Sequence, residues 1–164
     1  MNYIALQLEL GIATFLLAYV SIAFLRRWAQ RRMLDIPNSR SSHTRPTPRG
    51  GGIGIVISLL IGLWISYWLQ YQTLSTQTIV TFSIGAIFIA LVSWLDDMNS
   101  LSSVLRLFVH INSAILVLVG IGFLHTIVLP FDISIELGWL GIPLTFLWLT
   151  YFINAYNFMD GIDG

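Results

Sequence analysis

The chain has 164 residues, of which 56% are hydrophobic and only 10% are charged, and its formal net charge at pH 7 is zero. Together with a mean hydropathy of +0.80, this composition excludes a water-soluble domain of ordinary type. The sequence contains no cysteine, which excludes a disulfide framework. No excess of positive charge is available to attract nucleic acid, so no nucleic-acid partner is expected.

Five apolar stretches are long enough to cross a bilayer, which requires about 20 mostly apolar residues per helix. They are residues 4–25, 51–69, 79–95, 104–129 and 138–158. These runs lack the alternating pattern of membrane-barrel strands. We therefore predict an all-α polytopic membrane protein with about five transmembrane helices. No basic residue precedes the first stretch, so we expect it to remain as an anchor rather than to be removed as a signal peptide.

The arginines indicate the orientation of these helices. All eight basic residues are Arg, and seven of them lie between Arg26 and Arg49. The positive-inside rule places residues 26–50 in the cytoplasm and the N-terminus outside. Counting spans from there puts residues 96–103 and the polar C-terminal stretch 157–164 in the cytoplasm as well. We therefore predict that three polar clusters share one side of the membrane.

The first cluster reads "MLDIPNSRSSHTRPTPRGGGIGI" over residues 33–55. Its three prolines oppose a regular helix, while its hydroxyl, amide and guanidinium groups suit a polar ligand. The glycines that open the following helix allow close backbone approach, and free N–H groups at a helix N-terminus attract anions. The alternative is a positively charged topogenic loop followed by glycines for helix packing. On these residues in isolation both interpretations stay open.

The second cluster, "SWLDDMNSLSSVLRLFVH", spans residues 93–110. Asp96 and Asp97 are adjacent carboxylates, which repel each other unless a cation or a shared proton intervenes. Such a pair suits Mg²⁺, whose ligands are oxygens and usually include substrate phosphates. Arg106 could clamp an oxyanion, and His110 follows it on the same helix face. The alternatives are a solvated turn for the Asp pair, a snorkelling side chain for Arg106 and an interhelical hydrogen bond for His110.

The third cluster is the terminal "NAYNFMDGIDG". Asn154, Asn157 and Asp160 recur at intervals of three, so one helical face would present two amides and a carboxylate. Asp163 lies between two glycines. Amide and carboxylate oxygens are plausible ligands for a hard cation or a nucleotide. Helix capping is the alternative, and it explains one such residue more easily than four in ten.

These three motifs, in this order, resemble the polyprenyl-phosphate N-acetylhexosamine-1-phosphate transferases, which include the phospho-N-acetylmuramoyl-pentapeptide transferases. The loop "RSSHTRPTPRGGG" is closest in style to the O-antigen-initiating branch. The resemblance implies transfer of an N-acetylamino-sugar 1-phosphate from a UDP-sugar to undecaprenyl phosphate, with release of UMP. It also implies Mg²⁺ as cofactor, with Mn²⁺ as an alternative, and a multi-pass protein of the bacterial inner membrane with a cytoplasmic active site.

The resemblance also implies roles for individual residues. The catalytic positions are Asp96 and Asp97, with Asp96 as the candidate base. The metal positions are Asp97, Asn157 and Asp160. The substrate-binding positions are Asp163, as the uracil contact, with Asn154, Arg106, Arg45, Arg49, Gly51 and His43.

Membrane lipid is an expected partner, and a homodimer remains open. Family members have about ten or eleven spans, so we expect the chain to be the N-terminal half of a longer protein. Two other functions compete with the transferase. A transporter or channel segment would place polar residues through the depth of the bilayer, and an inactive truncated scaffold would have no turnover.

Overall fold

The structure is a computed structural model that describes residues 3–30, 34–35, 47–48, 50–69 and 74–159. Five long helices dominate it: α1 (Tyr3–Ala29), α2 (Gly52–Trp68), α3 (Thr76–Asn99), α4 (Ser103–Gly120) and α5 (Gly141–Met159). Two small antiparallel hairpins join them: β1 (Leu34–Asp35) with β2 (Thr47–Pro48), and β3 (Thr126–Leu129) with β4 (Ile133–Glu136). Short 3₁₀ turns occupy η1 (Pro130–Asp132) and η2 (Gly138–Leu140). The prediction of an all-α class is confirmed.

Helix length and composition support membrane insertion. Within the described ranges, three helices are long and apolar enough to cross a membrane, namely α1, α3 and α4. The apolar helix α2 is shorter, at 17 residues. Helix α5 is continuous and carries the amides Asn154 and Asn157 near its C-terminal end. Each of the five helices overlaps one of the five predicted spans, and the chain is a membrane protein.

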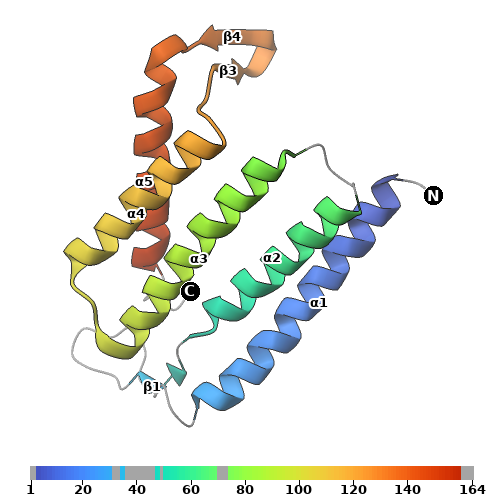
Figure 1. Ribbon diagram of the computed structural model, residues 1–164, viewed down its shortest axis with the longest axis vertical. Coiled ribbons are helices and arrows are strands. Elements are labelled where there is room, and N and C mark those ends of the chain that lie inside the picture. Colours follow the sequence, from blue (N-terminus) through green and yellow to red (C-terminus); the bar gives the residue numbers. More distant parts are fainter. Residues whose placement is uncertain (1–2, 31–33, 36–46, 49, 70–73, 160–164) are drawn as a thin grey trace.

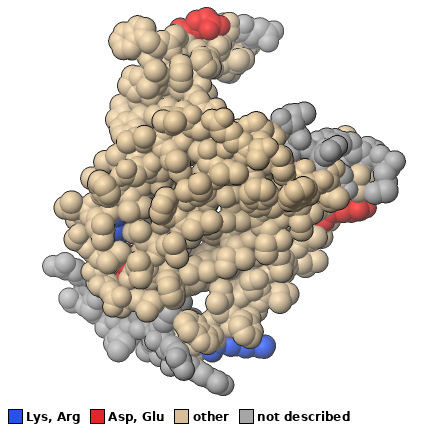
Figure 2. Space-filling view, viewed as in Figure 1, with Lys and Arg blue, Asp and Glu red and all other residues tan. Residues whose placement is uncertain are grey.

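The surface of the molecule is what a lipid environment requires. The hydrophobic residues that are buried are few and mostly small: Ala29, Ile79 and Ala114. Many large apolar side chains are exposed along every helix, and Figure 2 shows that almost all of the visible described surface is uncharged. In water such contiguous apolar area would drive association. In a bilayer, acyl chains cover it.

Helices α1 and α2 pack closely because α2 presents small residues to its neighbour (Figure 1). Gly54, Ser58 and Gly62 recur every fourth residue and are all buried. A Cβ atom at Gly62 would collide with the Thr14 side chain, and one at Gly54 would crowd Leu25. Small residues at this spacing let membrane helices approach through their backbones. Of the glycines after Arg49, Gly54 thus has the packing role that was one of the two interpretations open from the sequence, whereas a Cβ atom at Gly51 or Gly52 would meet nothing within 4 Å.

The predicted fourth span was too long. Residues 104–129 were expected to form one helix, but α4 ends at Gly120 and residues 126–129 form β3. Gly122 has a φ of +109°, a conformation that glycine adopts readily and that breaks the helix. The β-branched run that follows pairs with β4, from Thr126 opposite Glu136 to Leu129 opposite Ile133. Hydropathy alone does not distinguish this apolar hairpin from the end of a helix.

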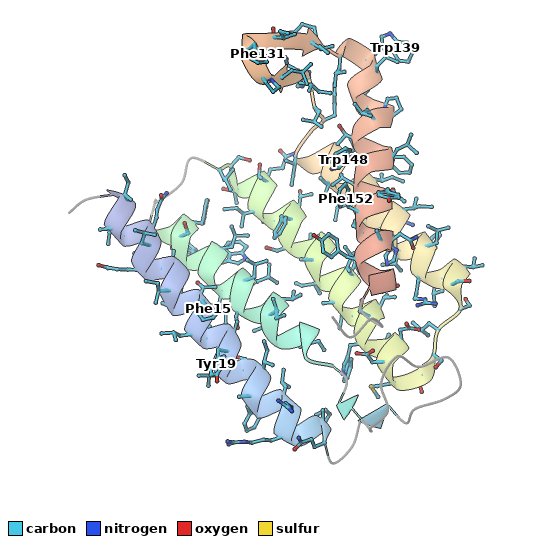
Figure 3. The ribbon with its side chains drawn as sticks, turned by 180° about the vertical axis from the view of Figure 1, so that it is seen from behind. Phe15, Tyr19, Phe131, Trp139, Trp148 and Phe152 are labelled. Atoms are coloured by element: carbon cyan, nitrogen blue, oxygen red, sulfur yellow. The ribbon has the colours of Figure 1, made fainter. Side chains whose placement is uncertain are left out.

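The β3–β4 hairpin projects from one end of the helices. Figure 3 shows Phe131 at its tip, Trp139 where it joins α5, and Trp148 and Phe152 neighbouring one another along α5. Phe131 is 96% exposed and has a φ of +68°. Aromatic residues at such positions are typical of a membrane–water interface. The hairpin lies at the end of the bundle opposite to the turn that joins α3 to α4 (Figure 1).

Two helices extend into the segments that were predicted to be cytoplasmic loops. Residues 26–50 were expected to be loop, but α1 continues to Ala29 and includes Arg26 and Arg27. Residues 96–103 were expected to be loop, but α3 continues to Asn99. Charged residues end an apolar run without ending a helix, because helical hydrogen bonding continues past the membrane boundary. This extension decides how Asp96 and Asp97 are presented.

Candidate functional site

The ends of three helices meet at one end of the bundle. Helix α3 ends there, α4 begins there, and α5 returns toward it from the β3–β4 hairpin, while α1 also ends and α2 begins at that end (Figure 1). The polar residues of the second and third sequence motifs therefore lie at the same level. This arrangement fits the prediction that the clusters share one side.

Asp96 holds the turn between α3 and α4. Its backbone oxygen accepts a hydrogen bond from the Ser100 N–H at 2.8 Å, and its side-chain Oδ1 accepts one from the Leu101 N–H at 2.6 Å. Ser100 takes the left-handed conformation (φ 44°) that commonly ends helices. Ser102 then caps α4, because its hydroxyl accepts a hydrogen bond from the Leu105 N–H at 3.3 Å. The chain thus reverses within three residues.

This reversal brings Arg106, on the first turn of α4, back to Asp96. Arg106 Nη1 donates to Asp96 Oδ2 at 3.2 Å and to Asn157 Oδ1, on α5, at 3.5 Å. The side chains are only partly exposed, 32% for Arg106 and 22% for Asp96. Water screens such a pair less than a surface pair, and removing one partner leaves a poorly solvated charge. One guanidinium nitrogen therefore links α3, α4 and α5.

His110 extends this cluster along α4. It follows Arg106 by one helical turn and is 2% exposed. The Asn154 side chain on α5 lies within hydrogen-bonding range of its imidazole. Asn154 lies one turn before Asn157 on α5. The His110–Asn154 contact is therefore one helical turn away from the Arg106–Asn157 contact. The sequence interpretation of His110 as an interhelical contact agrees with this placement.

The structure thus gathers four of the predicted site residues: Asp96, Arg106, Asn154 and Asn157. Asp97 lies next to Asp96 on the last turn of α3 and is half-buried. Gly51 stands apart from these contacts, at the N-terminus of α2. The remaining predicted positions lie outside the described residues, namely His43, Arg45, Arg49, Asp160 and Asp163. The roles assigned to all of these residues remain predictions.

Sequence reasoning left two members of the site without a role. His110 received no role in the reaction, although its i+4 spacing from Arg106 indicated that the two side chains share a helix face. Ser100 was not singled out, and no local pattern indicated that a serine would take a left-handed conformation there. Its N–H donates to the Asp96 backbone oxygen, and the following N–H, of Leu101, donates to the Asp96 side chain.

The arrangement suits the binding of anionic groups more than the transfer of protons. Both Asp96 oxygens are already engaged, one by a backbone N–H and one by Arg106. The guanidinium has five N–H donors, and its Nε makes no hydrogen bond within the described residues. Planar guanidinium groups of this kind bind phosphate oxygens well. The cluster therefore offers guanidinium N–H donors, held by a carboxylate, at one end of the helices.

The part of the chain described contains no group of three His, Asp or Glu side chains close enough to hold a metal ion. The oxygen donors nevertheless have the chemistry that Mg²⁺ prefers, because Asp97 supplies a carboxylate and Asn157 an amide carbonyl. Mg²⁺ commonly takes only one or two protein ligands and completes its shell with water and substrate phosphates. The types of donor present thus suit Mg²⁺, and the Asn157 Oδ1 that would bind it also accepts a hydrogen bond from Arg106 Nη1 at 3.5 Å.

The fold and this cluster define a polytopic membrane protein with a charged site at one end of its helices. A sequence profile of the family described as "Glycosyl transferase family 4" matches residues 79–164, which include every residue of the cluster. The chain belongs to this family. No solved structure matches the chain significantly.

Curated relatives agree with this assignment. The chain is 33% identical, over 80% of its own length and 36% of the relative's, to a probable undecaprenyl-phosphate N-acetylglucosaminyl 1-phosphate transferase of Bacillus subtilis. It is 30% identical to an undecaprenyl-phosphate alpha-N-acetylglucosaminyl 1-phosphate transferase of Thermotoga maritima, over 94% of the chain and 44% of the relative. A phospho-N-acetylmuramoyl-pentapeptide-transferase of Halalkalibacterium halodurans is 27% identical to the chain, over 93% of the chain and 50% of the relative. The chain thus spans half or less of these relatives' lengths.

Proposed function

We propose that the protein transfers an N-acetylamino-sugar 1-phosphate from a UDP-sugar to undecaprenyl phosphate and releases UMP. The observation that carries this proposal is the bridge from Arg106 Nη1 to Asp96 on α3 and Asn157 on α5. Family membership and the printed names of the relatives support the reaction class. A reaction between two phosphates requires preorganised donors to phosphate oxygens, and the Arg106 guanidinium, held by Asp96 and Asn157, supplies such donors.

In this reaction an oxygen of the lipid phosphate attacks the sugar-bearing phosphorus of the UDP-sugar, and the phosphorus–oxygen bond to UMP breaks. Little covalent chemistry is left for the protein, whose task is to position both phosphates and to stabilise their charge. The Arg106 guanidinium would bind phosphate oxygens through its remaining N–H groups. Asp96 and Asn157 would hold it in place from either side.

The geometry favours a different role for Asp96 from the base implied by the family resemblance. A phosphate monoester has a second pKa of about 6, so at pH 7 a lipid phosphate is already largely ionised and needs no base. Asp96 instead keeps one oxygen on Leu101 and the other on Arg106. We assign Asp96 the task of positioning Arg106.

Magnesium belongs to the same proposal. Asp97 and Asn157, with Asp160 outside the described residues, are the side chains that would hold the ion. When bound, Mg²⁺ would neutralise the negative charge on the donor diphosphate and thereby lower repulsion against the incoming lipid phosphate. Mn²⁺ has similar oxygen preferences and is expected to substitute for it.

The proposed reaction is tested by incubating the membrane-embedded protein with UDP-N-acetylglucosamine, Mg²⁺ and undecaprenyl phosphate. We expect UMP to appear in step with a lipid-linked sugar, and neither to appear when the lipid phosphate is omitted. UMP is measured by chromatography and the lipid product by mass spectrometry. If no UMP forms with any UDP-linked N-acetylamino sugar, the proposed function is wrong.

The glycan pathway is a finer part of the proposal. The loop of residues 40–52 supports a place at the start of O-antigen or another cell-envelope glycan. A panel of UDP-linked N-acetylamino sugars in the same assay would rank the donors and thereby narrow the pathway.

We also propose that the cluster faces the cytoplasm across the bacterial inner membrane. Arg26 and Arg27 lie on the last turn of α1, at the same end as Asp96 (Figure 1), and basic residues favour the cytoplasmic side. The chain has no native cysteine, so single cysteines can report on orientation.

Gln30→Cys, at the end of α1, and Ser134→Cys, on the β3–β4 hairpin, are both at exposed positions. In intact cells a membrane-impermeant maleimide should label Ser134→Cys and leave Gln30→Cys unlabelled until the membrane is opened. Labelling of Gln30→Cys in intact cells would show that the protein has the opposite orientation in the membrane. The cysteine-free parent chain serves as the blank.

A further inference from the structure

Four buried side-chain atoms lack a hydrogen-bond partner within the described ranges, and all four lie on α4 and α5. They are Arg106 Nε, His110 Nδ1, Ser113 Oγ and Thr150 Oγ1. His110 and Ser113 are 2% and 3% exposed, so neither reaches bulk solvent. Their shared location calls for one explanation rather than four separate ones.

The sequence spacing places these atoms in a line. Arg106, His110 and Ser113 occupy positions i, i+4 and i+7 of α4, which is one helix face. On α5, which runs in the opposite direction (Figure 1), the same spacing joins Asn157, Asn154 and Thr150. Arg106 contacts Asn157 at 3.5 Å, and His110 interacts with Asn154 one turn further in. We call these six residues the α4–α5 polar seam.

The seam enters the membrane-spanning part of the molecule. Seven residues of helix correspond to a rise of about 10 Å, so the seam reaches well inside from the Asp96 end of the bundle. Unsatisfied polar groups are costly in a bilayer, where no bulk water replaces the missing hydrogen bonds. A dry seam would therefore carry four such groups together.

We propose that the α4–α5 polar seam binds a short file of water molecules that is continuous with the aqueous phase beside Asp96. Water fits because the unpaired atoms differ in kind: the guanidinium Nε only donates, whereas the two hydroxyls both donate and accept. The Arg106 charge is already balanced by Asp96, and the seam contains no carboxylate, so a neutral ligand suits it better than a cation. Buried waters typically satisfy groups of this kind.

The file is expected to end within the membrane rather than to cross it. One turn beyond Ser113 and Thr150 the corresponding positions are Val117 and Phe146, which offer no polar side chain. Water in the seam solvates Arg106 from the membrane side while Nη1 faces Asp96 and Asn157. In this proposal the polar residues within the bilayer serve the site at the Asp96 end of the helices.

Thermal unfolding distinguishes a hydrated seam from a dry one. Removing an unpaired buried hydroxyl stabilises a dry interface, whereas removing a hydroxyl that binds water destabilises a hydrated one. We expect Ser113→Ala and Thr150→Val each to lower the melting temperature in lipid nanodiscs by about 2–4 °C. The control is Ser58→Ala, because the buried Ser58 hydroxyl already donates to the Gly54 oxygen at 2.7 Å. A rise in melting temperature of either seam variant relative to the unmodified protein would overturn the proposal.

Radiolytic labelling detects the water directly, because hydroxyl radicals formed from bound water oxidise adjacent side chains. In the folded protein we expect His110 to be oxidised within milliseconds despite its burial. The combined Ser113→Ala and Thr150→Val variant should reduce this labelling severalfold, since it removes two ligands of the file. Equal labelling of His110 in the two proteins would show that the seam is dry.

Discussion

Replacing Arg106 by Met is expected to reduce sugar-phosphate transfer by about 10²–10³-fold, the loss typical when a fixed charge-stabilising donor is removed from an active site. Met keeps much of the aliphatic volume but removes the cation that links Asp96 with Asn157. UMP release under saturating UDP-sugar, with separate titration of the lipid phosphate, measures the effect. Since the lost contact is to phosphate, turnover should fall together with affinity for the lipid substrate.

Two further variants make this prediction specific. Arg27→Gln removes an exposed arginine from the last turn of α1 and should leave turnover unchanged. Arg106→Lys retains the charge without the planar fork of donors, so it should recover only part of the activity. Full turnover in Arg106→Met would remove this residue from the site.

Asp96→Asn is expected to lower transfer by about 10²-fold and to destabilise the protein by about 1–3 kcal/mol, because a charged hydrogen-bond partner of Arg106 is lost. The amide oxygen can still accept from the Leu101 N–H, so the turn between α3 and α4 should persist. Turnover and the unfolding midpoint in the same membrane mimetic report the two effects. Glu136→Gln is the matched control, since Glu136 is exposed on the distant hairpin and accepts a hydrogen bond from Thr126 at 3.1 Å.

A double-mutant cycle separates the two roles considered for Asp96. If Asp96 acts by positioning Arg106, the Asp96→Asn and Arg106→Met changes are strongly non-additive, and the double variant is hardly slower than Arg106→Met alone. If Asp96 is instead an independent base, the losses multiply. Multiplying losses would restore the role implied by the family resemblance.

Sequence reasoning located the membrane helices because hydropathy reports burial in lipid, residue by residue. It misplaced the ends of helices, because backbone geometry rather than hydropathy determines where a helix ends. The apolar residues 126–129 continued the predicted fourth span, yet Gly122 ends the helical region and β3 pairs with β4. The acidic residues after Leu95 ended the predicted third span, although α3 continues to Asn99.

For the candidate site, the sequence indicated the residue types but not their partners. Asn157 is 51 positions from Arg106, and only the packing of α5 against α4 shows that they meet. The polar character of the α4–α5 seam was hidden because Ser113 and Thr150 are ordinary residues within apolar helices. Their significance comes from being buried without a hydrogen-bond partner, which is a property of the folded chain.

The contacts of Asp96 also bear on how the chain enters the membrane. The bonds from Leu101 and Arg106 span only five and ten positions in the sequence, so they can form as soon as α3 and α4 emerge together. An isolated arginine is costly to insert, whereas a neutral Asp–Arg pair costs less. The turn that organises the site thus also allows α3 and α4 to partition as a helical hairpin, and α5 then docks onto a charge pair that is already neutralised.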